Sequence, residues 1–368
     1  MPPTPYRSTA PTFLLLLLAG CPAVPTGGGA VEPVEPPIVE PVVEPVVEPV
    51  VEPVVESVVE PVVEPVVESV VEPVVEPVVE PVVEPAVEPE PGFLGGDDEA
   101  LLRVVCDEAP TRWARNARGT TISFRMYFED GSSALFKPSQ ILSHSRWEAE
   151  VAAYRLSRAL GMNHVPPSCP RRASREDLVG AEGVTADFRT RMTEEVQFDG
   201  DGMAYGMAMY WVPSLREEPE IRSGGEWRWW IAKGGHIPEG HEADAAALSD
   251  LVLLDWLTVN SDRWSGQQIR RAGSADGPLV FIDNAAGFSP TWEGLTGAVW
   301  PVFYKAQRFR ASVVERLRAL DDAALDDLLG DVLDVDQLDG LRERRDRALE
   351  RIDELLEEFG RDSVLYFE

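Results

Sequence analysis

The sequence has few histidines and no long apolar segment near its start, and each shortage excludes a class of protein. The four histidines do not show the paired spacing of zinc ligands, and only His236 and His241 lie close, five residues apart. No Gly-x-Ser-x-Gly elbow of a serine hydrolase is present. The apolar run Phe13–Leu18 is far too short to span a bilayer. These absences argue against a zinc enzyme, a serine hydrolase and a membrane-spanning helix at this run.

Positive charge is missing from one long segment. Residues 31 to 92 contain 16 of the 64 acidic residues and no Lys or Arg. Residues 93 to 368 contain the other 48 acidic residues against 32 basic ones, and 48 − 32 leaves a net charge of about −16 there. Duplex DNA and anionic headgroups require clustered Lys and Arg, so we expect no nucleic acid among the partners. This part is long enough for one two-lobed domain or two small ones.

Cysteine is scarce as well. The chain has three, and Cys21 belongs to the export signal described next. The remaining pair, Cys106 and Cys169, is an even number in a chain with an export signal, so a disulfide between them is one reading. Two separate buried thiols are the other reading.

The first residues resemble a lipoprotein signal peptide. Arg7 precedes the apolar run, which ends Leu18-Ala19-Gly20-Cys21. Small residues before a cysteine resemble a lipobox, so residues 1–20 are predicted to be removed and Cys21 to be diacylated. The acyl chains would attach the protein to a membrane without spanning it. No Asp follows Cys21, which favours the outer membrane and a cell-envelope location. Ordinary cleavage with an incidental Cys21 is the alternative.

Residues 21–92 are predicted to be a low-complexity linker. Most of this segment repeats Val-Val-Glu-Pro with a period of four residues. Proline disfavours helix and the regular glutamates repel one another, which favours an extended, polyproline-like chain. At about 3.1 Å per residue, roughly 60 residues would reach on the order of 190 Å. The segment is either a selected spacer or a repeat expansion without a selected length.

Residues 120 to 161 show the periodicities of a hairpin followed by a helix. Apolar side chains alternate along Thr120–Phe128, which predicts a strand, and Asp130-Gly131 predicts a two-residue turn. A second strand is expected over Ser133–Lys137. The segment Trp147–Leu160 then predicts a helix, with Gly161 as its C-terminal cap.

The second half of the chain is predicted to be mainly helical. An apolar stretch, Met203–Val212, ends at Pro213, and residues 214–244 resemble a long loop rich in Gly, Pro and Trp. Ala245–Val259 predicts a helix that is buried on most sides, and Pro278–Ile282 predicts a strand. The C-terminal third shows amphipathic helical patterns.

Four charged residues follow one another in an order that phosphoryl transfer requires. Lys137 ends a strand after a hairpin, a Glu lies on the next helix, Asp262 follows the buried helix, and Asp283 ends a later strand. In kinase folds such a Lys orients the phosphates and the Glu holds the Lys. One Asp accepts the acceptor's proton and the other binds the metal. Each of these residues alone has an ordinary structural explanation, and it is their order along the chain that indicates phosphoryl transfer.

Several motifs resemble the secretory-pathway kinases, the family of the Golgi casein and xylose kinases. The matching segments lie between about residues 119 and 290. They are Ala134-Leu135-Phe136-Lys137-Pro138, Glu148 to Leu156 with its continuation to Pro167, Tyr210-Trp211-Val212-Pro213, Asp255-Trp256-Leu257 with Asn260-Ser261-Asp262-Arg263, and Phe281-Ile282-Asp283-Asn284 with Gly287-Phe288.

The resemblance implies an α+β, two-lobed protein-kinase-like fold, with an N-lobe over 93–213 and a C-lobe over 214–368. It implies ATP with Mg²⁺ or Mn²⁺ as cofactors and a hydroxyl on a protein Ser/Thr or a glycan as acceptor. It also implies roles for individual residues. Glu150, not Glu148, would hold Lys137; Asp262 would be the catalytic base; Asp283 and Gln267 would be metal positions; Gly119 and Trp211 would border the nucleotide.

Three departures keep other functions open. Trp264 and Ala285 stand where relatives often have His and Gly, and Gln267 stands where Asn is common across wider kinase folds. These departures are compatible with a catalytically inactive pseudokinase that serves as a binding or scaffold module. The low-complexity linker and the Trp-rich segment (residues 227–230) are compatible with an adhesion or envelope-structural lipoprotein, although core packing also explains the tryptophans. The residues Arg171, Arg172 and Arg175 form either a basic groove or a solvated loop.

Overall fold

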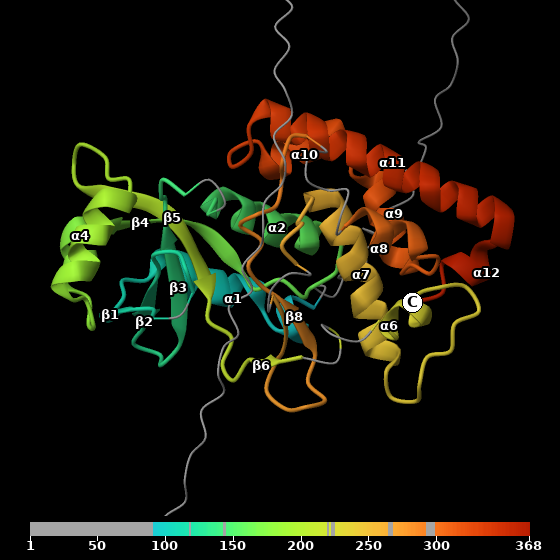
Figure 1. Cartoon of the computed structure of the whole chain (residues 1–368), viewed down its shortest axis with the longest axis horizontal. Coiled ribbons are helices and arrows are strands. Elements are labelled where there is room, and N and C mark those ends of the chain that lie inside the picture. Colours follow the sequence, from blue (N-terminus) through green and yellow to red (C-terminus); the bar gives the residue numbers. More distant parts are fainter. Residues whose placement is uncertain are drawn as a thin grey trace, which may run out of the picture. The chain divides into compact units, whose positions relative to one another are not determined.

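A computed structural model describes residues 91–368 except 118, 143–144, 219–220, 222–224, 264–267 and 292–298. The predicted signal peptide, Cys21 and the repeat segment lie outside the described residues. The described residues all belong to one compact unit. Figure 1 shows its two parts, a β-rich part at the left and a helical part at the right, with α2 between them.

The β-rich part is built on an antiparallel sheet with strand order β1-β2-β3-β5-β4. Side chains on one face of the hairpin, such as Phe124, Met126 and Phe136, are fully buried, as the alternation predicts. The strands are β1 (Arg112–Arg115), β2 (Phe124–Tyr127), β3 (Ser133–Pro138), β4 (Ser168–Ser174) and β5 (Met203–Tyr210). Strand β2 is shorter than the predicted Thr120–Phe128.

The turn of the hairpin has three residues, not the two that Asp130-Gly131 predicts. Phe128 and Ser132 face each other through a backbone hydrogen bond of 3.1 Å, which leaves residues 129–131 between them. Gly131 adopts φ +85°, the left-handed conformation that closes such a turn. The Asp130 carboxylate accepts a hydrogen bond from the Ser132 N–H at 2.8 Å, which stabilises the turn.

Helix α2 (Trp147–Ala159) follows the hairpin and packs against β4 and β5. It agrees with the predicted helix to within one residue. The chain leaves the helix at Leu160, and Gly161 takes the left-handed conformation with φ +72°, which a side chain would disfavour.

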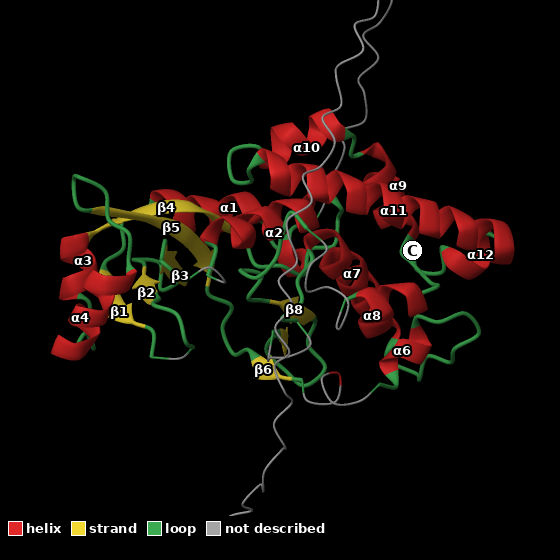
Figure 2. Cartoon of the chain, turned by 45° about the horizontal axis from the view of Figure 1, so that its top comes forward, coloured by secondary structure: helices red, strands yellow, loops and turns green. Residues whose placement is uncertain are grey.

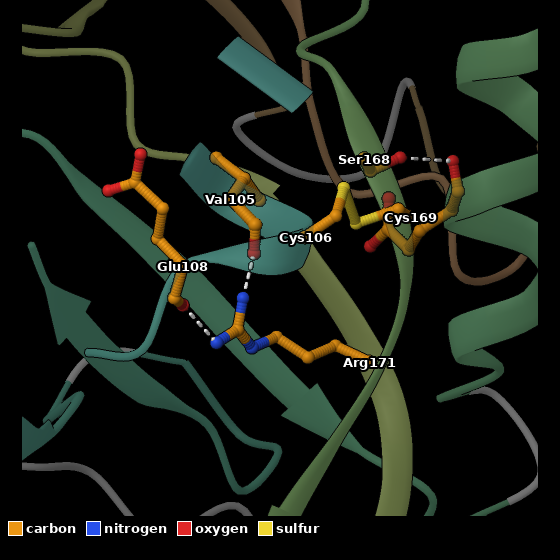
Figure 3. The surroundings of a disulfide bond; sticks show 7 residues. Val105, Cys106, Glu108, Ser168, Cys169 and Arg171 are labelled. Atoms are coloured by element: carbon orange, nitrogen blue, oxygen red, sulfur yellow. Dashed lines mark hydrogen bonds between the residues drawn. A yellow bond between two sulfur atoms is a disulfide. The ribbon is translucent and has the colours of Figure 1, made fainter. Parts of the chain in front are cut away.

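A disulfide fastens the N-terminal segment to the sheet, so the first of the two readings of Cys106 and Cys169 is correct. The two sulfurs are bonded and the Cα atoms lie 6.1 Å apart (Figure 3). The segment consists of η1 (Phe93–Gly95), α1 (Asp98–Leu102) and the π-helix η2 (Arg103–Asp107). Asp98 also ties it to α2, because its carboxylate accepts a hydrogen bond from the Tyr154 hydroxyl at 2.9 Å.

The arginines at 171, 172 and 175 form neither a groove nor a loop. Arg171 and Arg172 lie on the edge strand β4. Because the sequence of β4 is polar, the sequence alone does not predict a strand there. Arg171 donates to the carbonyl oxygens of Val105 and Glu108 beside the disulfide (Figure 3). Arg172 pairs with Asp199, and the Arg175 guanidinium lies over the Phe198 ring. These guanidinium groups are engaged in separate local contacts.

Two helices that the sequence pattern does not reveal lie between β4 and β5. They are α3 (Arg175–Gly180) and α4 (Ala186–Glu195), and Ser174 and Thr185 cap their N-termini. Phe188 and Met192 of α4 are buried in the same cluster as Phe124 of the sheet. The insertion therefore completes the core of the β-rich part.

The helical part is organised around α7 (Glu242–Thr258), of which 14 residues are buried. It begins three residues before the predicted Ala245. Trp256 stacks on Phe303 of α8 with ring centroids 4.3 Å apart, and its indole N–H donates to the Arg344 carbonyl of α11 at 2.9 Å. The surrounding helices are α8 (Trp300–Lys305), α9 (Ala311–Ala319), α10 (Asp322–Leu329), α11 (Val335–Phe359) and α12 (Arg361–Val364) (Figure 2).

A small antiparallel sheet with the order β6-β7-β8 adjoins α7. Its strands are β6 (Arg216–Glu217), β7 (Ile269–Arg271) and β8 (Leu279–Phe281). The segment predicted as a long loop over 214–244 contains β6 and the short helix α6 (Trp227–Trp230). In the described part of the chain, every helix is too short or too polar to cross a membrane.

Candidate active site

A cavity of about 680 Å³ lies where the five-stranded sheet meets the loops that follow α7 and β8. The loop before β2 and the strands β3 and β5 form one side of it, and the segments around Asp262 and Asp283 form the other. Its lining includes Gly119, Lys137, Glu150, Asp262 and Asp283. The structure thus brings five of the residues selected from the sequence to one cavity.

Lys137 is buried against two carboxylates. Its ammonium nitrogen lies 2.8 Å from Glu150 Oε1 and 3.2 Å from Asp283 Oδ1, and only 8% of its side chain is exposed. Burial lowers the pKa of Lys137, but the charges of Glu150 and Asp283 outweigh it and raise that pKa above its usual value. Lys137 is therefore a fixed positive charge at neutral pH.

Glu150 connects the lysine to the turn after β8. Its second oxygen accepts a hydrogen bond from the Asn284 backbone N–H at 2.8 Å, and the side chain is 1% exposed. Glu148, two residues earlier on α2, lies on another cavity with Arg146 and Asp334. The helix thus directs Glu150, and not Glu148, toward Lys137.

Asp283 stands at a sharp turn of the backbone. Its φ is +59°, a left-handed conformation that Asp tolerates better than most residues. One oxygen contacts Lys137, yet 52% of the side chain is exposed. The carboxylate is thus held by the lysine and still open to the cavity.

Asp262 lies on the opposite wall, in the loop that follows α7. Helix α7 ends at Val259, whose φ of +59° is strained for a β-branched residue. The Asn260 amide of the same loop reaches the Asp283 carbonyl at 3.4 Å. Asp262 itself is exposed, and Gln268 Nε2 donates to its Oδ2 at 3.1 Å. The loop therefore presents a hydrogen-bonded carboxylate to the cavity.

Buried Arg263 connects the loop after α7, which contains Asp262, with the turn after β8, which contains Asp283. It pairs with Asp255 of α7 at 3.1 Å, and neither side chain is exposed. Its guanidinium also donates to the Ile282 carbonyl at 2.6 Å and to the Asn284 side chain. Burial raises the pKa of Asp255 to about 6, against the opposing effect of Arg263. The arginine therefore fixes the position of Asp262 relative to Asp283.

The loop before β2, which lines the cavity, is held by the side chains of Gln140 and Arg191. The Gln140 amide bonds both the N–H and the carbonyl of Ile122, at 2.7 and 2.9 Å. Arg191 of α4 donates to the Thr120 carbonyl at 2.6 Å. Gly119, the candidate for covering phosphates, adopts φ +90° and lines the cavity next to Thr120.

Three selected residues are placed elsewhere or lie outside the description. Trp211 is half-buried under the Arg125 guanidinium at 4.3 Å and is absent from the lining of the cavity in the described part of the chain. Met209, two residues earlier on β5, lines it instead. Gln267 and Trp264 lie outside the described residues.

The oxygen donors present suit Mg²⁺ or Mn²⁺ bound together with phosphates. These hard cations favour one or two carboxylates, waters and phosphate oxygens over a closed protein cage. Asp283 offers a half-exposed carboxylate, and Gln268, whose Oε1 is buried without a hydrogen-bond partner among the described residues, adds an amide to the same lining. Asp283 is the candidate ligand that fits best.

Sequence reasoning missed the residues that support the site. Gln268, Met209 and Gln140 carry no pattern of their own. Asp255 and Arg263 did carry a signal, because an acidic residue in a buried apolar helix requires a cationic partner. Their spacing of eight residues conceals the contact, since the helix ends between them.

No family model matches the chain. Four-jointed box protein 1 of Mus musculus is 30% identical over 210 residues, 51% of this chain and 42% of that protein. Human glycosaminoglycan xylosylkinase is 24% identical over 300 residues, 67% of this chain and 72% of that protein. The chain thus spans less than half the length of the first of these relatives.

Solved structures show the fold. The Golgi casein kinase superposes with a TM-score of 0.57 at 18% identity, over 73% of this chain and 79% of that one. The same kinase with Mn/ADP bound gives 0.55. The α+β, kinase-like fold expected from the motifs is therefore confirmed. The chain is thus similar in sequence to these two proteins and similar in fold to the Golgi casein kinase.

Proposed function

We propose that this protein transfers the γ-phosphate of ATP to a hydroxyl of a protein Ser/Thr or a glycan. One observation carries the proposal: Lys137 is paired with both Glu150 and Asp283, and Asp262 lines the same cavity. Kinase folds require the lysine–glutamate pair and the metal-binding aspartate to be in place at the same time. The names of the relatives include a casein kinase and a glycosaminoglycan xylosylkinase, which supports both acceptor classes.

Each residue has a task that its surroundings support. Lys137 remains charged and orients phosphate oxygens, while Glu150 holds its ammonium group in place. Asp262 accepts the proton of the acceptor hydroxyl, and the bond from Gln268 orients its carboxylate. Asp283 would hold a divalent cation, which neutralises charge that develops on the phosphates. The chemistry depends on position and charge more than on covalent participation.

The proposal includes attachment to the cell envelope. Cleavage before Cys21 and acylation of its sulfur would place the protein on a membrane, and the repeat segment would hold the kinase-like part away from it. The amino-acid pattern at residues 18–21 supports this, as does the disulfide, which forms in oxidising compartments. Mass spectrometry of the purified protein would detect the diacylglycerol, and Cys21→Ser would release the protein from membranes if the proposal is right.

The first experiment measures thermal unfolding of the full chain with ATP, with and without Mg²⁺ or Mn²⁺. A ligand that binds only the native state, at 100 times its dissociation constant, adds about 2.7 kcal/mol of stability. We expect a metal-dependent shift that is lost in Asp283→Asn and kept in Asp336→Asn, an exposed acidic residue on α11. No shift with any nucleotide would contradict the proposal, and a shift without phosphotransfer to any acceptor would identify a nucleotide-binding pseudokinase.

A further inference from the structure

The N-terminal segment, which consists of η1, α1 and η2, contacts all three hydrophobic clusters of the described residues. Phe93 forms a buried cluster with Val212, which follows β5, and with Val280 of β8. Leu102 packs against the cluster around α7, and buried Val105 belongs to the core of the five-stranded sheet. The disulfide to β4 holds the other end of the segment. The segment is therefore fixed relative to both parts of the molecule.

A buried carboxylate in this segment, that of Asp98, has three donors. Its Oδ1 accepts a hydrogen bond from the Phe93 N–H at 2.6 Å, and its Oδ2 accepts one from the Tyr154 hydroxyl at 2.9 Å. Arg158 Nε lies 2.9 Å from the same Oδ2. Asp98 is 8% exposed, and a side chain at Gly92 would collide with its Oδ1. Hydrogen bonds to an ionised group are stronger than neutral ones, so this carboxylate is a firm attachment point.

The two donors on α2 lie in one row with Glu150. Glu150, Tyr154 and Arg158 are four positions apart, the spacing that places side chains one above another on a helix. Glu150 bonds Lys137 and the Asn284 N–H, both at 2.8 Å. The row thus carries the active-site contacts at its first position and the contacts with α1 at its other two. Figures 1 and 2 both show α1 beside α2.

The contacts of Glu150 require a defined rotation of α2 about its axis. A side-chain atom about 5 to 6 Å from the axis moves by about 1 Å when a helix turns by roughly 10°. A shift of about 1 Å takes a hydrogen bond of ordinary length beyond its useful range, and it can lower a reaction rate about 100-fold. Hydrophobic burial has no direction, whereas the hydrogen bonds that Asp98 accepts from α2 do.

We propose that Asp98 is a positioning residue: it sets the rotation of α2 and thereby directs Glu150 toward Lys137. The inference rests on the proposed function and adds to it a residue outside the cavity, because Asp98 is not among the described residues that line it. The same segment packs on Val280, three residues before Asp283. It therefore holds the glutamate helix in place relative to the strand that leads to the candidate metal ligand.

The first test measures amide hydrogen exchange by NMR in the full chain without nucleotide. The Asn284 N–H reports on Glu150, because Glu150 Oε2 is its acceptor. In Asp98→Asn we expect the Asn284 amide to exchange about tenfold faster, while the amides of β5 keep their rates. Glu99→Gln, an exposed neighbour on α1, is the control for the loss of one negative charge and should leave the Asn284 amide unchanged.

A milder variant provides the same test if Asp98→Asn does not fold. Tyr154→Phe keeps the carboxylate and the ring and removes one of the three donors. We expect the Asn284 amide to exchange about threefold faster in this variant. Tyr205→Phe is the matched control, because Tyr205 is 47% exposed and lies on β5, under the Arg172 guanidinium.

Phosphotransfer kinetics then test the connection to catalysis. We expect Asp98→Asn to lower kcat/KM for ATP about tenfold in the wild-type background but by less than about twofold in Glu150→Gln, because both changes act through one carboxylate. Equal factors in the two backgrounds, or an Asn284 amide unchanged in both Asp98→Asn and Tyr154→Phe, would overturn the proposal. If the wild-type chain transfers no phosphate, the proposed function fails, and the exchange rates still decide whether Asp98 directs Glu150.

Discussion

Helix α7 carries two ion pairs of the same kind, one at its middle and one near its C-terminal end, and the two arginines differ in what else they contact. Near its C-terminal end, buried Asp255 pairs with Arg263, which also bonds the Ile282 carbonyl and the Asn284 side chain of the candidate site. Five residues earlier, buried Asp250 pairs with Arg310, which bonds the carbonyl of Glu368 at the C-terminus. Burial of a carboxylate requires a partner at both places. Only the Asp255–Arg263 pair also contacts residues of the candidate site.

The largest effect is expected from the carboxylate that the first pair positions. Asp262→Asn removes the proton acceptor but keeps the shape and the hydrogen bond with Gln268 within reach. We expect phosphotransfer to fall about 1,000-fold, with the melting temperature nearly unchanged because Asp262 is exposed. Steady-state kinetics with purified protein measure the first effect and thermal unfolding the second. Activity within tenfold of the wild type would remove Asp262 from the mechanism.

Substitution of Arg263 and of Arg310 distinguishes an effect on stability from an effect on activity. Removing one member of a buried ion pair destabilises a protein by about 3 to 5 kcal/mol, so Arg263→Met and Arg310→Met should both unfold at lower denaturant concentrations. Below the unfolding transition, we expect only Arg263→Met to lose phosphotransfer as well, because it releases the Asp262 loop from the turn at Asn284. If Arg310→Met were equally inactive while folded, the site would not depend specifically on Arg263.

The two buried aspartates should also make stability depend on pH. Burial raises the pKa of Asp250 to about 7 and that of Asp255 to about 6, and the paired arginines only partly oppose it. The folded protein then holds protons that the unfolded chain releases above about pH 4. Their stabilising contribution is present below that pH and is lost as the pH rises through the folded-state values.

Asp250→Asn should therefore flatten the fall in unfolding free energy between about pH 4 and 7, by about 4 kcal/mol. Urea unfolding at several pH values measures it. Glu357→Gln, on the surface of α11, is the control for the loss of one negative charge. An unchanged slope in Asp250→Asn would show that Arg310 keeps Asp250 ionised throughout.

The smallest effect is expected where both partners are in water. Arg361 and Glu315 lie 3.0 Å apart, with 64% and 62% of their side chains exposed. Exposed pairs contribute little because water screens them and long side chains lose freedom. Arg361→Gln should change the unfolding free energy by at most about 0.5 kcal/mol, as measured by urea unfolding. A loss comparable to that of Arg263→Met would contradict the assignment of the effect to burial.

Much of the fold followed from local patterns, and the exceptions have a common cause. Strand β3, helix α2 and helix α7 were predicted within about three residues, because a turn signal precedes β3, a broad apolar face marks α2 and a nearly continuous apolar run marks α7. Strand β4 was missed since an edge strand with the sequence Ser-Cys-Pro-Arg-Arg-Ala-Ser has its charged side chains in local contacts. Helices α3 and α4 were missed because they are short and largely exposed on one face.

The candidate site divides in the same way. The order of Lys137, Glu150, Asp262 and Asp283 along the chain can be read from the sequence. Trp211 was predicted to border the nucleotide, but Met209 lines the cavity instead. Trp211 follows the last residue of β5, and its ring lies under the Arg125 guanidinium, whereas Met209 lies within the strand.

The sequence by itself determined which charged residues this protein has for phosphoryl transfer and on which kinds of element they lie. Composition, hydrophobic periodicity and turn residues are local properties, and they suffice for that. Only the tertiary structure decided that Lys137 meets Asp283, 146 positions away, whereas the family resemblance had already favoured Glu150 over Glu148 as the partner of Lys137. Helix α2 is buried on several sides, so its periodicity names no unique face, and the packing of the sheet against α7 selects one.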